Sequence, residues 1–208
     1  MMNITYQVKQ AVYVNLTNRC PCDCAFCLRR NGPGVYGSAS LWLEREPTVK
    51  EVIDSLATWD LSKYAEVVFC GYGEPTERLP ELLEVARWLK ANRPAVSVRV
   101  NTNGLADLIA GKPTAALFQG LVDTLSISLN TPDAKEYLAL CRPRFGEAAY
   151  PAMLRFAEEA RKYVPKVVMT IVGAPVTSLE KQAACQAICD RLGVTLRVRP
   201  YENPAAHK

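Results

Sequence analysis

The stretch AVYVNLTNRCPCDCAFC, residues 11–27, joins an apolar β-branched run to a loop that contains four cysteines. Its first seven residues have the composition of a buried strand, because β-branched and aromatic side chains favour extended backbone. Thiols this close together in a reducing compartment are more often metal ligands than disulfides. The stretch therefore predicts a strand whose carboxyl end carries a metal site on Cys20, Cys24 and Cys27.

Five more strand-like runs follow, and segments of helical period separate them. The strands are expected at 65–70, 96–101, 123–129, 166–172 and 194–200. The helices are expected at 48–59, 78–92, 151–164 and 178–193, with N-caps at Thr48 and Ser178 and a C-cap at Gly193. The segment 106–119 predicts only a short helix, and residues 4–8 predict an additional edge strand.

This alternation of strands and helices indicates an α/β fold with a parallel sheet. Six βα units are too few for a closed eight-stranded barrel, so the pattern leaves an open doubly wound sheet or a partial barrel. In both architectures, the loops at the carboxyl ends of the strands carry the function.

Composition favours one globular domain. The chain has 208 residues, of which 49% are hydrophobic and 22% are charged, which suits a single sizeable core. We expect this domain to span 1–200, with 201–208 as a flexible tail. The net charge is +4, but Lys and Arg are spread along the chain, so no nucleic-acid partner is evident. The sequence shows neither a leader nor an apolar run long enough for a membrane span, which predicts a cytoplasmic protein.

The three spaced cysteines suit a cubane iron–sulfur cluster, because thiolates are soft ligands and a short loop can hold three corners of a cube. Such a loop leaves the fourth iron open to a substrate or cofactor. Zinc is the alternative, since Cys22 would complete a set of four soft ligands. The protein would then be a zinc-binding interaction module or a metal carrier without catalysis.

The CxxxCxxC spacing, with Phe26 directly before its last cysteine, resembles the motif of the radical S-adenosylmethionine (SAM) enzymes. The resemblance implies a (βα)6 partial TIM barrel, one [4Fe-4S] cluster, and SAM chelated to the open iron. It also implies a one-electron reductant of the flavodoxin or ferredoxin type. Reductive cleavage of SAM would give a 5′-deoxyadenosyl radical that abstracts hydrogen from an unidentified substrate.

Further motifs lie at the strand ends where this family would bind SAM. CGYGEP, residues 70–75, resembles the GGEP motif of the family, with Tyr72 in place of a glycine. Gly71 and Gly73 would permit close backbone approach, and Glu74 would accept from the methionine ammonium group. The strand SISLN places alternate polar residues on one face, suited to ribose hydroxyls and the methionine carboxylate. The other expected contacts are Phe26, Asn103, Ser126, Ser128, Asn130 and Arg199.

The whole pattern is most similar to that of the small TatD-associated radical SAM proteins, judged from NLTNRC, GYGEP, SLNTPDA and CRPRFGEAAY. This likeness implies the core fold and SAM cleavage, and it implies no particular substrate. A minimal partial barrel leaves its lateral opening uncovered. We therefore expect a protein partner or a homodimer to close it.

Cys141, in the stretch LCRPRFG, has two interpretations. As a catalytic residue it would donate a hydrogen atom or bind substrate near the radical, with Arg142 and Arg144 holding an anionic group. As a structural residue it would be the buried end of a helix that Pro143 stops. Its position, only approximately at the active face, favours the structural interpretation.

Overall fold

The computed structural model describes residues 2–30, 32–34 and 37–201. Seven strands form one sheet in the order β1-β2-β3-β4-β5-β6-β7. Their bounds are β1 Thr5–Val8, β2 Ala11–Val14, β3 Glu66–Phe69, β4 Ser97–Thr102, β5 Thr124–Ser128, β6 Lys166–Val172 and β7 Thr195–Arg199. The predicted edge strand is confirmed as β1, which pairs antiparallel with β2, and all later pairs are parallel. The sheet is open, with β1 and β7 at opposite ends of the order, as a partial barrel requires.

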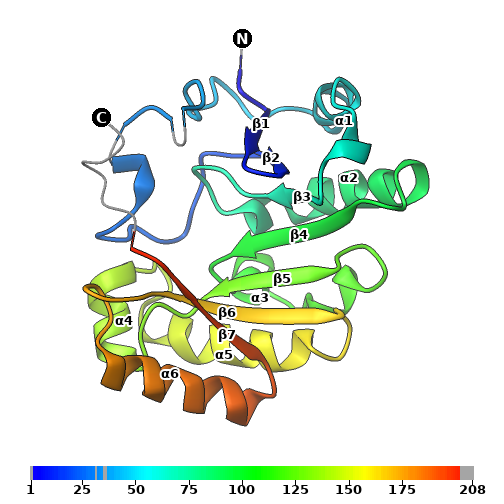
Figure 1. Ribbon diagram of the computed structural model, residues 1–208. Helices are drawn as coiled ribbons and strands as arrows, with labels where there is room; N and C mark the ends of the chain where they lie inside the picture. Colours follow the sequence, from blue (N-terminus) through cyan, green and yellow to red (C-terminus); the bar gives the residue numbers. More distant parts are fainter. Residues whose placement is uncertain (1, 31, 35–36, 202–208) are drawn as a thin grey trace.

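Helices connect the parallel strands and lie along one side of the curved sheet (Figure 1). They are α1 Val49–Ala57, α2 Leu79–Asn92, α3 Ala106–Ala110, α4 Ala134–Cys141, α5 Ala149–Ala160 and α6 Leu179–Leu192. Short 3-10 turns are η1 Leu28–Arg30, η2 Leu61–Lys63, η3 Pro75–Arg78, η4 Ala115–Phe118 and η5 Gly146–Ala148. The expected short helix is confirmed as α3, whereas α4 lies outside the helical ranges named from the sequence. The expected tail falls largely at 202–208, outside the described residues.

The predicted helix caps are confirmed. Thr48 accepts a hydrogen bond from the backbone of Glu51, whose side chain bonds back to the Thr48 backbone, so α1 begins with a capping box. Ser178 accepts from the backbone of Lys181 at the start of α6. Gly193 ends α6 in the left-handed region, with φ of 68°, where a side chain would be strained.

The alternation of side chains along the strands builds two different faces. In β4, Val98 and Val100 are buried in the core under the helices, whereas Arg99 and Asn101, which alternate with them, are only partly buried. In β5, Leu125 and Ile127 alternate with polar residues in the same way. The convex face is therefore apolar and covered, and the concave face of β4 and β5 is polar.

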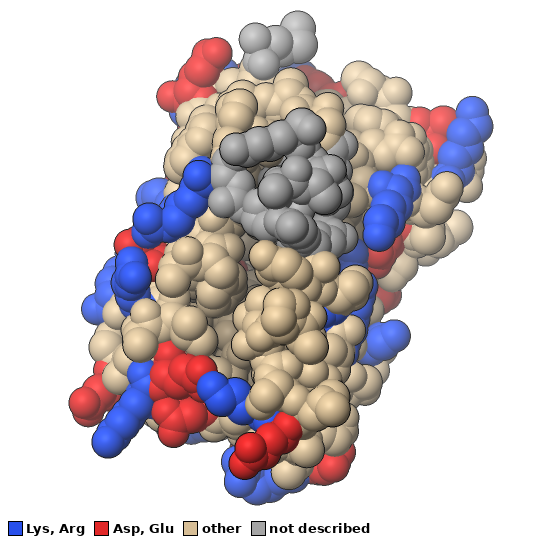
Figure 2. Space-filling model, turned by 60° about the vertical axis from the view of Figure 1, so that its left-hand side comes forward, with Lys and Arg blue, Asp and Glu red and all other residues tan. Residues whose placement is uncertain are grey.

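The charged surface of the molecule is mixed in sign. Figure 2 shows blue and red side chains interspersed around one face of the molecule. Such mixing is typical of a solvated protein surface. Within the described part of the chain, no helix is both long and apolar enough to span a membrane.

Candidate functional site

The cysteine loop that follows β2 is held against the end of α4 by backbone hydrogen bonds. The amide of Asp23 donates to the carbonyl of Cys141 at 3.0 Å, and the amide of Ala25 donates to the carbonyl of Leu140 at 2.8 Å. In return, the amide of Arg144 donates to the carbonyl of Pro21 at 2.8 Å. Carbonyls at a helix end have no partner within the helix, so the loop satisfies groups that α4 leaves open.

Two arginines that follow the cysteines also support the loop. Arg29 donates through Nη2 to the carbonyl of Cys22 at 3.2 Å, and Arg30 donates through Nε to the carbonyl of Cys24 at 3.3 Å. Both guanidinium groups also pair with Asp23. The conformation of the loop is therefore fixed from within as well as from α4.

The four thiols of the loop differ in their surroundings. Cys20, Cys24 and Cys27 are partly exposed, whereas Cys22 is only 5% exposed and packs in the main apolar core. Side-chain hydrogen bonds link the Cys22 thiol to Cys20 and Cys24 and raise the pKa of Cys22. The amide of Asn103 donates to the Cys22 sulfur at 3.8 Å. Cys22 thus lies in the core, whereas Cys20, Cys24 and Cys27 are partly exposed, with Cys20 and Cys24 packed against the core from outside.

The same contacts favour thiolates at two of the three outer cysteines. The hydrogen bond from Cys22 lowers the pKa of Cys20. Hydrogen bonds from Cys141 first, and then from Cys22, lower the pKa of Cys24 to about 4. Burial raises the pKa of Cys27, and the charges of Cys24 and Cys20 raise it further by a smaller amount. The three sulfurs are therefore close enough to interact electrostatically. Thiolate is the form that binds metal.

This donor set fits an iron–sulfur cluster. Three partly exposed thiols come from one short loop, and soft thiolates are the ligands that such clusters require. Within the described ranges, no group of three or more His, Cys, Asp or Glu side chains is arranged to hold a single metal ion. Cys20, Cys24 and Cys27 are the residues that would hold the cluster.

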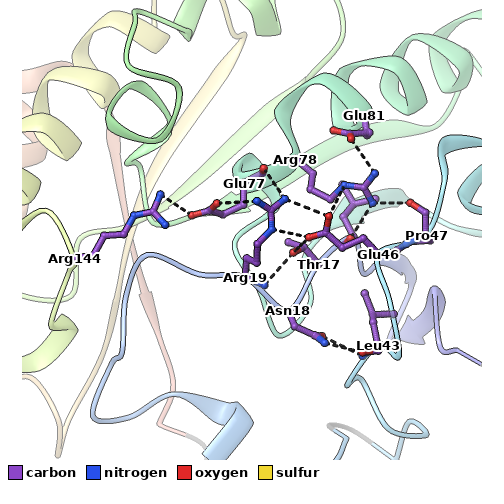
Figure 3. Close-up of polar contacts among 11 residues, drawn as sticks. Thr17, Asn18, Arg19, Leu43, Glu46, Pro47, Glu77, Arg78, Glu81 and Arg144 are labelled. Atoms are coloured by element: carbon purple, nitrogen blue, oxygen red, sulfur yellow. Dashed lines mark hydrogen bonds and ion pairs between the residues drawn. The ribbon is translucent and has the colours of Figure 1, made fainter.

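A network of charged side chains fixes the backbone that enters the cysteine loop (Figure 3). Glu46 accepts from the hydroxyl of Thr17 at 2.6 Å and pairs with Arg19 at 2.7 Å. Glu77, whose side chain is almost fully buried, pairs with Arg19 at 3.6 Å and with Arg144 at 3.1 Å. The network ties the residue before Cys20 to η3 and to the segment after α4.

The two glycines of the CGYGEP motif are required by the chain itself. A Cβ built on Gly71 would lie 2.0 Å from Oδ1 of Asn15, and one on Gly73 would lie 2.2 Å from the carbonyl oxygen of Thr17 and 2.6 Å from that of Arg19. The close backbone approach expected at these positions is therefore made by residues 15–19, which lead into the cysteine loop.

Tyr72, between these glycines, packs under the segment that follows the cysteines. Its hydroxyl donates to the carbonyl of Gly32 at 2.7 Å, and its ring meets Trp42 edge-on with centroids 5.1 Å apart. The side chain is buried together with Leu41 in a small apolar cluster. In the described structure, Tyr72 thus stabilises the segment beside the loop, and its contact with SAM stays a prediction.

Glu74 joins two strand ends. Its carboxylate is 4% exposed and accepts from the hydroxyls of Thr76 and Thr102, both at 2.7 Å, and from the backbone amides of Thr76 at 3.1 Å and Asn103 at 2.7 Å. Burial raises its pKa, and these hydrogen bonds act in the opposite direction. The described geometry uses this carboxylate to position the loop after β4, and the expected contact with the methionine ammonium group stays a prediction.

Two asparagines at the strand ends reach the cysteines. Asn103, after β4, bonds to Cys22, and Asn130, after β5, donates through Nδ2 to the Cys141 sulfur at 3.2 Å. Asn130 adopts φ of 65°, a left-handed conformation that asparagine tolerates better than most residues. Cys141 is 1% exposed, so its described contacts are structural, and a catalytic role for it stays a prediction.

The remaining expected contacts lie around the same end of the sheet. Ser126 and Ser128 are partly buried on the concave face of β5, as the alternation predicts. Arg199 ends β7, and its Nε is buried with no hydrogen-bond partner among the described residues. Phe26 is 43% exposed beside Cys27. The fold therefore gathers residues from 20 to 199 around the carboxyl ends of the strands.

The sequence analysis missed the charged residues of the concave face. Arg99 and Arg197 lie on β4 and β7, each among alternating residues whose neighbours point to the opposite face. The period-two pattern that identified Ser126 and Ser128 contains this information as well.

Comparison with known families shows which superfamily the chain belongs to. The radical SAM superfamily profile matches residues 14–186, which is most of the chain. The chain belongs to the radical SAM superfamily. No curated protein sequence matches it significantly.

Solved structures of radical SAM proteins share the fold. A radical SAM methyltransferase from Sphaerobacter thermophilus aligns with a TM-score of 0.59 and 16% identity, over 97% of this chain and 70% of that one. Native anSMEcpe with bound AdoMet aligns with a TM-score of 0.61 and 16% identity, over 92% of this chain and 51% of that one. At this identity the likeness shows the fold alone, and the radical SAM chain described here spans about half the length of anSMEcpe.

Proposed function

We propose that the protein is a radical SAM enzyme with one [4Fe-4S] cluster on Cys20, Cys24 and Cys27. The observation that carries the proposal is the division of the loop thiols, with three partly exposed and Cys22 buried in the core. Three protein ligands leave one iron open, which is where SAM would bind. When bound, the cluster and SAM would supply reductive cleavage of the sulfonium and hydrogen abstraction from a substrate.

The chain's own residues would bind and orient SAM. Gly71–Gly73 and Glu74 form the turn beside the cysteine loop, and Asn103, Ser126, Ser128 and Asn130 follow on the next two strands. The support for this assignment is their shared position at the carboxyl ends of parallel strands, where partial barrels and related folds place their sites. Phe26, Tyr72 and Arg199 complete the proposed contacts.

Several finer features of the proposal come from the sequence motifs. The likeness of four motifs to the TatD-associated radical SAM proteins supports membership in that subgroup. A flavodoxin or ferredoxin would supply the electron, as the family requires a reductant. The loop thiols, free in the described structure, support a reducing, cytoplasmic location.

The lateral opening of the barrel supports a covering partner. Strand β7 is an edge strand whose Val198 is 43% exposed, and Val176 and Leu179, between β6 and the body of α6, are 54% and 79% exposed. Exposed apolar side chains next to a strand edge are a site for association. We expect size-exclusion chromatography to show a dimer or a complex, and a monomer with full turnover on a small molecule would remove this part of the proposal.

Electron paramagnetic resonance of the anaerobically reconstituted, reduced protein tests the central proposal. We expect the signal of a reduced [4Fe-4S] cluster that shifts when SAM is added, because SAM coordinates the open iron. A cluster signal that does not respond to SAM would refute the SAM site and leave the metal site standing. No signal, together with stoichiometric zinc, would establish the zinc-binding module instead.

A further inference from the structure

The concave face of the sheet holds a cavity that the SAM site does not use up. The cavity is half-open, and its volume is about 440 Å³. It lies against the first residues and middles of β3 to β7, whereas the cysteine loop follows the carboxyl end of β2. Its lining residues are Glu66, Arg99, Thr124, Ser126, Lys166, Val168, Thr195, Leu196 and Arg197.

The strand register places the basic residues of this lining. Arg99 is level with Thr124, and Thr124 is level with Lys166, so Arg99 and Lys166 lie in one row across the floor. Arg197 is level with Thr170, which is level with Ser128, so Arg197 rises along the wall toward the SAM site. Hydroxyls of Thr124, Ser126 and Thr195 lie between these cations.

The charge of the lining is unbalanced. Three cations face one carboxylate, and that carboxylate, Glu66, pairs with Arg99 at 2.8 Å. Within the described part of the chain, Lys166 and Arg197 make no ion pair or hydrogen bond through their side chains. Two cationic groups at one cavity without an anion are typical of a site that binds one.

Buried polar atoms on the same face also lack partners. Among the described residues, Nε of Arg99, Oδ1 of Asn101 and Nε of Arg199 are buried without a hydrogen bond. Buried polar groups in proteins are nearly always paired, because an unpaired one loses its hydrogen bonds to water and gains none within the protein. Of these residues Arg99 lines the cavity, and its unpaired Nε is a donor that an anionic ligand would satisfy.

We propose that this cavity binds the substrate through an anionic group, a carboxylate or a phosphate, held at the floor by Arg99 and Lys166, with Arg197 contacting the same ligand from the wall above them. This inference rests on the proposed function in one respect, because it takes the bound anion to be the substrate of the enzyme. A cavity of this volume suits a small molecule. Guanidinium groups match the planar, two-oxygen geometry of carboxylate and phosphate.

The position of the cations also orients the ligand. Arg99, on β4, precedes Asn103 directly after that strand by four residues, which is about 13 Å at roughly 3.3 Å per residue. The anionic group would therefore lie at the floor, and the other end of the molecule would extend past Ser126 toward the SAM site. The substrate would be an elongated molecule whose reacting carbon is remote from its anionic group.

Binding of small probes to the reconstituted protein tests the inference. Phenyl phosphate, benzoate and neutral benzyl alcohol are titrated at low salt by calorimetry, with and without SAM. We expect one or both anions to bind and the alcohol not to, and comparison of the two anions distinguishes phosphate from carboxylate. Equal affinity for the alcohol and the anions would overturn the inference.

Variants locate the binding. Arg197→Gln and Lys166→Gln each remove a cation that has no partner among the described residues, and we expect each to weaken anion binding by about tenfold. Glu66→Gln removes the competing carboxylate and should tighten binding severalfold. Arg155→Gln, at an exposed position on α5, changes the net charge equally and should have no effect.

The results separate this inference from the proposed function. If the paramagnetic signal shifts with SAM but Arg197→Gln binds the anions as tightly as the unaltered protein, the inference is wrong and the proposed function stands. If anion binding follows the expected pattern while SAM has no effect, the cavity is an anion site, and its link to radical chemistry is refuted.

Discussion

Replacing Cys24 by alanine is expected to abolish iron binding, whereas Cys22→Ala is expected to retain a full cluster after the same anaerobic reconstitution. Cys24 is partly exposed, and its pKa is lowered to about 4 by hydrogen bonds from Cys141 and Cys22. Cys22 is buried, and its pKa is raised. Because Cys24 belongs to the CxxxCxxC spacing and the buried Cys22 does not, the two positions should differ almost completely in iron content.

The measurement is iron and acid-labile sulfide per chain, with circular dichroism to confirm folding. Cys22→Ala should cost only about 1 kcal/mol or slightly more in the free energy of unfolding, as small truncations in a core do. Cys189→Ala is the matched control, since Cys189 is fully buried on α6, away from the loop, and should leave the iron content unchanged. Equal loss of iron in the Cys22 and Cys24 variants would refute the ligand assignment.

Local patterns allowed most of the fold to be predicted. Thr48, Ser178 and Gly193 mark helix ends through hydrogen bonds to neighbours within a few residues, so their sequence context contains the whole signal. The alternation in SISLN likewise places Ser126 and Ser128 on one face. Such features depend on contacts between residues that are close together in the sequence, so the local sequence is enough to predict them.

Contacts between distant segments were not predictable in the same way. The amide of Ala25 bonds to Leu140, and Glu74 bonds to Thr102, across long stretches of chain. No periodicity in either segment encodes its partner. The sequence motif therefore predicted only that Glu74 binds a ligand. Its hydrogen bonds to Thr102 and Asn103 became visible only in the folded chain.

Gly73→Ala is expected to destabilise the protein by more than about 3 kcal/mol and to prevent assembly of the cluster. An added Cβ would lie 2.2 Å from the carbonyl oxygen of Thr17 and 2.6 Å from that of Arg19. Both atoms belong to the backbone that enters the cysteine loop, and Arg19 is held by Glu46 and Glu77. The backbone cannot yield without disturbing the position of Cys20, so stability and iron binding should fall together.

Two comparisons isolate this steric cause, with urea unfolding of the cluster-free variants as the readout. Gly111 has φ of 66° and open space around its Cβ position, so Gly111→Ala should cost only about 1 kcal/mol of backbone strain and retain the cluster. Gly71→Ala would meet the side chain of Asn15, so adding Asn15→Ala should recover part of its loss. A Gly73→Ala variant as stable as Gly111→Ala would show that the loop backbone is free to move. The close packing of the CGYGEP turn on residues 15–19 would then have no part in positioning the cluster ligands.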